Sequence, residues 1–220
     1  MTIQATALRR NTARRPPKLR DRLLYPFATR TRVLVVPGLH DSGPGHWQSI
    51  WQARHANLTR VQQDDFDSPD LERWSAGVAR AIDAADSPPI IVAHSFGCLA
   101  AVHALTRWAR SIAGALLVAP ADPDHFGIDL RLLDRRLSMP TTLVGSTNDP
   151  WLKFTKAGAL ASRWGSRFHG LGEAGHINAE SGHGAWPDGL GLLRDVAERA
   201  AAAGTLRAMP QRGLSLPVPA

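Results

Sequence analysis

The sequence predicts a three-layer α/β/α sandwich around a mostly parallel sheet of about six strands. Short apolar runs recur along the chain, and segments with helical apolar periodicity separate them. Such runs are typical of strands that are buried on both faces. Regular alternation of strands and helices indicates a parallel sheet that helices cover on both sides.

Six short apolar runs are the expected strands, at 33–36, 60–63, 89–93, 113–118, 141–144 and 166–169. Five intervening segments space their apolar residues as one face of a helix requires. In chain order these sets are Trp47, Ile50, Trp51 and Leu58; Leu71, Trp74, Val78, Ala81 and Ile82; Cys98, Val102, Leu105 and Ala109; Ala157, Leu160, Ala161 and Trp164; and Leu190, Leu193, Val196 and Ala200. Functional groups in such a sheet gather on the loops that leave the carboxyl ends of the strands.

Charge is spread unevenly along the 220 residues. The formal net charge is +7, but residues 1–32 hold nine basic residues and one acid, so the remainder is nearly neutral. Two adjacent prolines interrupt this basic segment, and it has no apolar period. We therefore expect residues 1–30 to be a disordered extension, with contact to nucleic acid or anionic lipid as the alternative. The folded domain is expected at 31–203, with a loose tail at 204–220.

The composition excludes several classes of protein. Cys98 is the only cysteine, so the chain has neither an internal disulfide nor a cysteine-based zinc site. No run approaches the roughly 18 apolar residues of a membrane span, and the N-terminal segment does not match a secretory signal. We expect a cytoplasmic protein whose folded domain does not bind nucleic acid.

Ser95 is the candidate nucleophile. It lies in Ala93-His94-Ser95-Phe96-Gly97, between an apolar strand and an apolar-periodic helix. This is the G-x-S-x-G pattern of the nucleophile elbow, with Ala93 in place of the first glycine. Small residues are needed on either side because neighbouring backbone crowds the turn. An ordinary helix-capping serine is the alternative interpretation.

The candidate acid and base follow the serine in the chain. Asp149 comes just after the strand at 141–144, and His176 lies on the loop after the last strand. The order serine, acid, histidine is the one that this arrangement of strands and helices uses. Asp122 or Asp124, one strand earlier, is the alternative acid.

The oxyanion of a tetrahedral intermediate needs backbone donors near Ser95. The N–H of Phe96, directly after the nucleophile, is one candidate. The N–H of Leu39, on the glycine-rich loop after the first strand, is the other. This loop lacks the full dinucleotide fingerprint. His40, Asp41 and His46 on it are more typical of loop hydrogen bonding than of a metal site, so we expect no metal and no cofactor.

The candidate pocket residues are His40, Trp47, His94, Trp151 and Trp186, with Phe96 as a further apolar candidate. Each tryptophan could equally belong to the core. His94 alternates with Ser95 along the strand, so it is expected to point away from the serine and to be packed and hydrogen-bonded. The Cys98 thiol is expected to be structural.

The sequence resembles the small serine hydrolases related to retinoblastoma-binding protein 9 and the bacterial YdeN-type proteins. The resemblance covers about residues 32–200 and rests on VPGLHDS at 36–42, GHW at 45–47, AHSFG at 93–97, STNDPW at 146–151 and GHINAESGHGAWP at 175–187. It implies an α/β-hydrolase fold without a large lid domain, and a triad of Ser95, Asp149 and His176. The human relative binds pocket proteins through an L-x-C-x-E sequence, which this chain lacks.

These observations lead us to expect a serine hydrolase that cleaves a small ester or amide through an acyl-enzyme. A carboxylesterase-like enzyme and an aminoacyl-amide hydrolase are both compatible with the triad. The partner is then a small acyl substrate. A catalytically silent binding protein on the same scaffold is the alternative.

Overall fold

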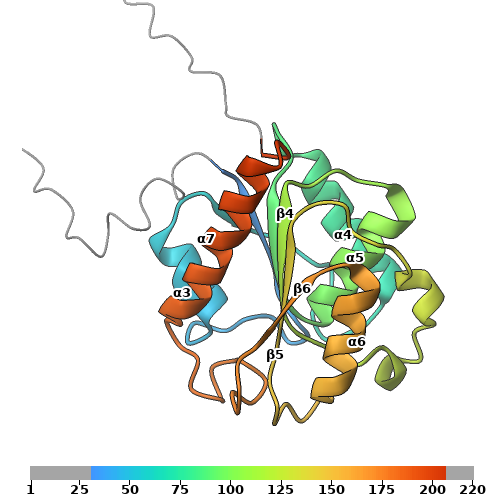
Figure 1. Cartoon of the computed structure of the whole chain (residues 1–220), viewed down its shortest axis with the longest axis vertical. Coiled ribbons are helices and arrows are strands. Elements are labelled where there is room, and N and C mark those ends of the chain that lie inside the picture. Colours follow the sequence, from blue (N-terminus) through green and yellow to red (C-terminus); the bar gives the residue numbers. More distant parts are fainter. Residues whose placement is uncertain (1–30, 207–220) are drawn as a thin grey trace, which may run out of the picture.

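The computed structural model describes residues 31–206, which form a six-stranded sheet with helices on both faces (Figure 1). The strands are β1 (Val33–Val36), β2 (Leu58–Arg60), β3 (Ile90–Ser95), β4 (Gly114–Pro120), β5 (Thr141–Gly145) and β6 (Arg167–Gly170). Their order is β2-β1-β3-β4-β5-β6, and all neighbours are parallel. The predicted α/β/α fold is confirmed. The expected extension at 1–30 and residues 207–220 of the expected tail lie outside the described residues.

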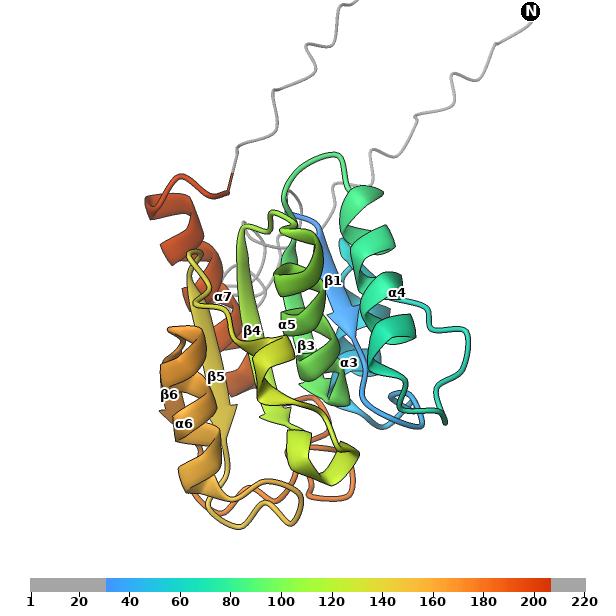
Figure 2. The same ribbon diagram turned by 90° about the vertical axis from the view of Figure 1, so that its right-hand side faces the viewer.

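Helices cover both faces of the sheet. Helices α3 (Trp47–Arg54) and α7 (Pro187–Ala202) lie on one face, and α4 (Leu71–Asp83), α5 (Phe96–Trp108) and α6 (Phe154–Trp164) lie on the other (Figure 2). Two short 3-10 helices, η1 (Pro123–Phe126) and η2 (Leu130–Leu133), connect β4 to β5. In the described part of the chain, no helix is long and apolar enough to cross a membrane.

The alternation of side chains along β1 and β3 divides the core in two. Leu34 and Ile91 point to the face under α4, α5 and α6, whereas Val33 and Ile90 point to the face under α3 and α7. Because both faces are buried, both sets of positions are apolar. This explains why β1 and the first part of β3 are continuous apolar runs in the sequence. The edge strands β2 and β6 instead contain polar and exposed residues, so the expectation of burial on both faces does not hold for them.

The second strand and the first helix differ from the expected boundaries. The helix ends at Arg54, because His55 is extended, and Leu58 then pairs with Val33 instead of continuing the helix. The strand is therefore Leu58–Arg60, and Val61 adds one further backbone bond to β1. At the C-terminal end of the domain, the Thr205 hydroxyl donates a hydrogen bond to the carbonyl oxygen of Ala113. Contacts with the domain therefore continue two residues past its expected end at residue 203.

Candidate active site

Ser95 sits at a sharp turn between the central strand β3 and helix α5. Its φ of 53° and ψ of −126° place a non-glycine residue in a strained conformation. The turn also brings α5 against the end of β1. A Cβ atom on Gly97 would lie 2.2 Å from the carbonyl oxygen of Pro37, so only glycine fits there. These features are those of a nucleophile elbow.

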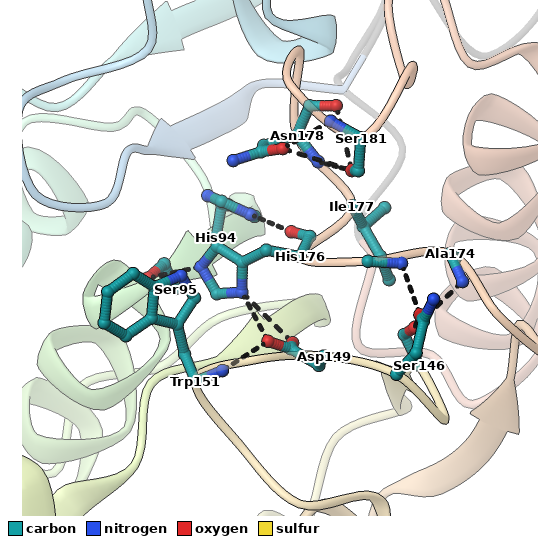
Figure 3. Close-up of polar contacts among 12 residues, drawn as sticks. His94, Ser95, Ser146, Asp149, Trp151, Ala174, His176, Ile177, Asn178 and Ser181 are labelled. Carbon is teal, nitrogen blue, oxygen red and sulfur yellow. Dashed lines mark hydrogen bonds and ion pairs between the residues drawn. The ribbon is translucent and has the colours of Figure 1, made fainter.

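A chain of hydrogen bonds joins Ser95, His176 and Asp149 (Figure 3). His176 Nε2 lies 3.0 Å from Ser95 Oγ, and His176 Nδ1 lies 3.0 and 3.1 Å from the two carboxylate oxygens of Asp149. The carboxylate accepts a hydrogen bond from the Nδ1–H group, which leaves the Nε2 lone pair facing the serine hydroxyl. The Asp149 side chain is 3% exposed and also accepts the backbone N–H of Trp151. The three residues that the sequence singled out therefore meet.

The alternative acids, Asp122 and Asp124, pair with another residue. Asp122 and Asp124 both pair with Lys156, whereas the carboxylate bonded to His176 is that of Asp149. Despite its partial burial, Lys156 has a raised pKa because the two carboxylates accept hydrogen bonds from its ammonium group.

Two side chains that the sequence reasoning did not single out join the acid loop to the histidine loop. Asn148 Oδ1 accepts the N–H of Gly175 at 2.7 Å, and Ser146 Oγ accepts the N–H of Ala174 at 2.9 Å. These bonds fix the segment before His176 relative to Asp149. The polar cluster between the strand and Pro150, a composition typical of turns, was the available signal.

Three imidazole rings lie in a row beside Ser95. His94 lies between His46 and His176, with ring centroids 4.8 Å from each. Burial, reinforced by the neighbouring histidines, lowers the pKa of His94 well below its usual range. Burial and the charge of Arg60 lower the pKa of His46 to about 4. His94 and His46 are therefore neutral near pH 7, and His94 donates its Nε2 proton to the carbonyl oxygen of His176.

The loop after β1 approaches Ser95 closely. A Cβ atom on Gly38 would lie 2.8 Å from Ser95 Cβ, so glycine is needed for this contact. Leu39 follows and lines the cavity above the serine. The next N–H, that of His40, is already donated to Phe66. Phe96 begins α5, where the first backbone N–H groups of a helix lack partners within the helix.

A cavity of about 660 Å³ opens over Ser95 and His176. Ser95 lies at the end of β3, between β1 and β4, so loops from both sides of this strand line the cavity. One side is formed by the loop after β1 and by residues 178–180, and the other by residues after β4 and β5, including Phe126 and Trp151. Trp151 is 57% exposed, and its ring lies 6.4 Å from that of His176.

The candidate pocket residues separate into two groups. His40, His94 and Trp151 line the cavity. Trp47 and Trp186 instead pack against each other in the core between the sheet and helices α3 and α7, with ring centroids 5.3 Å apart. Their large apolar surfaces are buried there, at 0% and 6% exposure.

Phe96, a further candidate for the pocket wall, and Cys98, expected to be structural, both lie in the core. Phe96 is fully buried against Trp74 and Phe126, and burial raises the pKa of the Cys98 thiol.

Within residues 31–206, no group of three or more metal-ligating side chains gathers. His40 pairs with Asp67, and Asp41 pairs with Arg60.

Comparison with known proteins agrees with the fold. Residues 33–195 match the serine hydrolase family, and the chain belongs to that family. More particularly, it is similar to a YdeN-like hydrolase of Pectobacterium atrosepticum, with 40% identity and a TM-score of 0.76 over 83% of this chain and 97% of that chain. The YdeN-type assignment and the hydrolase class are thus established.

More distant structures share the fold. The ydeN gene product of B. subtilis is 19% identical, with a TM-score of 0.61 over 76% of this chain and 99% of that chain. The esterase RhEst1 of a Rhodococcus species is 14% identical, with a TM-score of 0.60 over 78% and 92% of the two chains. No curated protein matches the chain.

Proposed function

We propose that this serine hydrolase cleaves a small ester or amide through an acyl-enzyme on Ser95. The observation that carries the proposal is the continuous hydrogen-bond chain from Ser95 through His176 to Asp149. A serine hydroxyl is a weak nucleophile unless a base takes its proton as it attacks. Here the base is adjacent, and a buried carboxylate orients it.

The first half of the reaction forms the acyl-enzyme. Ser95 Oγ attacks the carbonyl carbon while His176 Nε2 takes the hydroxyl proton, and the carbonyl π electrons move to oxygen. Asp149 holds the imidazole in the required tautomer and stabilises the imidazolium. The tetrahedral intermediate then collapses, and His176 gives the proton to the departing alcohol or amine.

The second half repeats these roles with water. His176 takes a proton from water, the resulting nucleophile attacks the acyl carbon, and Ser95 Oγ leaves with the proton from His176. In both halves the N–H groups of Phe96 and Leu39 would donate to the oxyanion. Each such donor is worth about 3 kcal/mol of transition-state stabilisation.

The surroundings of the site favour a small substrate. The connection between β4 and β5 contains two short 3-10 helices, which are too small to cover a long acyl chain. The cavity has the size of a pocket for a compact ligand. Apolar side chains of Leu39, Phe126 and Trp151 line it, so an apolar acyl or alcohol group would fit.

The proposal is tested by measuring hydrolysis of p-nitrophenyl esters from acetate to laurate, together with aminoacyl amides. We expect the highest kcat/KM with short acyl esters or with aminoacyl amides, and no turnover above background by the Ser95→Ala variant. Ser138→Ala, an exposed serine before β5, is the matched control and should keep full activity. Turnover by Ser95→Ala, or none by the wild type, would contradict the proposal.

A further inference from the structure

The turn that carries His176 has an unusual backbone. The residues on either side have left-handed conformations, with φ of 56° at Gly175 and 50° at Ile177. Glycine adopts this conformation freely, but a β-branched residue such as isoleucine rarely does. A strained backbone persists only where its surroundings hold it. The contacts of this turn therefore bear on the position of His176.

Two ring N–H groups meet consecutive carbonyl oxygens of this turn. His94 Nε2 lies 2.9 Å from the carbonyl oxygen of His176, and Trp47 Nε1 lies 2.8 Å from that of Ile177. Figure 3 shows the first of these contacts. His94 and Trp47 are 5% and 0% exposed, and hydrogen bonds shielded from water hold their partners more firmly than exposed ones do.

We propose that His94 and Trp47 are positioning residues that hold this turn in the arrangement that directs His176 Nε2 at Ser95. The inference rests on the proposed function, in which His176 is the general base. His94 directly precedes Ser95 on β3. Its hydrogen bond therefore joins the strand that carries the nucleophile to the loop that carries the base.

Packing of the rings supports the same role. His94 lies between His46 and His176, and Trp47 lies edge-on to His94 at a centroid distance of 6.0 Å. The side chain of Ile177 is fully buried in the core that contains Trp47. The loop that carries His176 is thus held by the two ring N–H groups and by the packing of Ile177. Asn148 holds it as well, by accepting the N–H of Gly175.

The test compares variants that lose one ring N–H with controls that do not. His94→Leu removes the donor at similar volume, whereas His94→Gln keeps an amide N–H near the same point. Trp47→Phe removes the other donor. Trp51→Phe is the matched control, because Trp51 is equally buried, packs on Trp47 and donates Nε1 to Ala185, at 2.8 Å and away from the His176 turn.

We expect His94→Leu to lower kcat about 10- to 100-fold per folded molecule, with KM within about twofold, since small displacements of reacting groups cost rates of this order. His94→Gln should recover most of the loss. Trp47→Phe should lower kcat at least about fivefold more than Trp51→Phe. Unchanged kcat in His94→Leu and Trp47→Phe, or an equal loss in both tryptophan variants, would overturn the inference. If His94→Leu does not fold, the tryptophan pair decides.

Amide hydrogen exchange tests whether His94 and Trp47 hold the His176 turn, and it does not depend on catalytic activity. In a Ser95→Ala background, His94→Leu and Trp47→Phe should speed exchange at residues 174–178, and Trp51→Phe should leave it as it is. Unchanged exchange in His94→Leu and Trp47→Phe would overturn the positioning role of these residues even if the wild type is active. Faster exchange in these two variants, together with a wild type that hydrolyses nothing, would instead support the positioning role and reject the proposed function.

Discussion

Gly97 and the carbonyl oxygen of Pro37 are packed so closely that a Cβ atom on Gly97 would lie 2.2 Å from that oxygen. The helix that follows the nucleophile therefore rests directly on the backbone of the loop after β1. This contact fixes the distance between Ser95 and the loop that holds Leu39. Both the stability of the fold and the geometry of the site depend on it.

Gly97→Ala should therefore destabilise the protein by about 3 kcal/mol and lower activity, because the obstructing atoms belong to the backbone and cannot rotate away. Urea unfolding and ester hydrolysis measure the two effects. The matched control is Gly191→Ala in helix α7, where a Cβ atom meets no neighbour within 4 Å. That variant should be about 0.5–1 kcal/mol more stable than the wild type. Equal free energies of unfolding for Gly97→Ala and Gly191→Ala would contradict the close packing of Gly97 on Pro37.

Asp149→Asn should lower kcat/KM about 10³- to 10⁴-fold, because the amide cannot hold the required tautomer of His176. The alternative acids provide the comparison. Asp124→Asn changes an exposed carboxylate that pairs with Lys156 and should leave kcat/KM within about twofold. A larger loss in Asp124→Asn than in Asp149→Asn would move the acid to the loop after β4.

Trp151→Ala should raise KM about tenfold for substrates with an apolar or aromatic group, with a small change in kcat. The exposed indole lines the cavity, and an aromatic contact is worth about 1 kcal/mol beyond its buried area. The backbone N–H of residue 151 remains to orient Asp149. The control is Leu132→Ala, an exposed apolar residue on η2 that does not line the cavity. Substrate saturation curves for both variants decide the question.

The stability of the protein should fall as the pH is lowered from about 6.5 to about 4. The pKa of His46 is about 4 in the folded protein and about 6.5 when unfolded, so the unfolded chain binds a proton in this range that the folded protein excludes. The linkage amounts to roughly 2 kcal/mol between pH 7 and pH 5 for this residue. The lowered pKa of His94 acts in the same direction.

His46→Asn isolates the contribution of His46. Asparagine can accept the N–H of Gln48 as His46 does, but it does not titrate. Urea unfolding at pH 7 and pH 5 should show a smaller loss of stability in this variant than in the wild type. An equal loss in both proteins would mean that His46 is not the group that takes up the proton.

The sequence was sufficient to predict the sheet and the residues that meet at its carboxyl edge. Ser95 ends a strand, Asp149 and His176 each follow one, and the parallel arrangement of the strands brings these positions to the same edge of the sheet. The pattern was less informative where packing decides. Leu58 fits a helical period, yet it pairs with Val33 in the sheet.

Side-chain partners across the fold could not be predicted from the sequence. Trp47 belongs to a polar glycine-rich stretch, so a pocket wall and a core position looked equally reasonable. Its place under the His176 turn depends on a hydrogen bond that spans 130 residues of chain. The left-handed conformation of Ile177 likewise has no local signal, because isoleucine disfavours it.

The central claim is that Ser95 is the nucleophile, and covalent labelling with a fluorophosphonate tests it most directly. We expect one phosphonyl group per molecule of folded wild-type protein, found on the peptide that contains Ser95. Heat-unfolded protein and Ser95→Ala should remain unlabelled, and Asp149→Asn should react far more slowly. Failure of the folded wild type to react, or equal labelling of Ser95→Ala, would contradict the account.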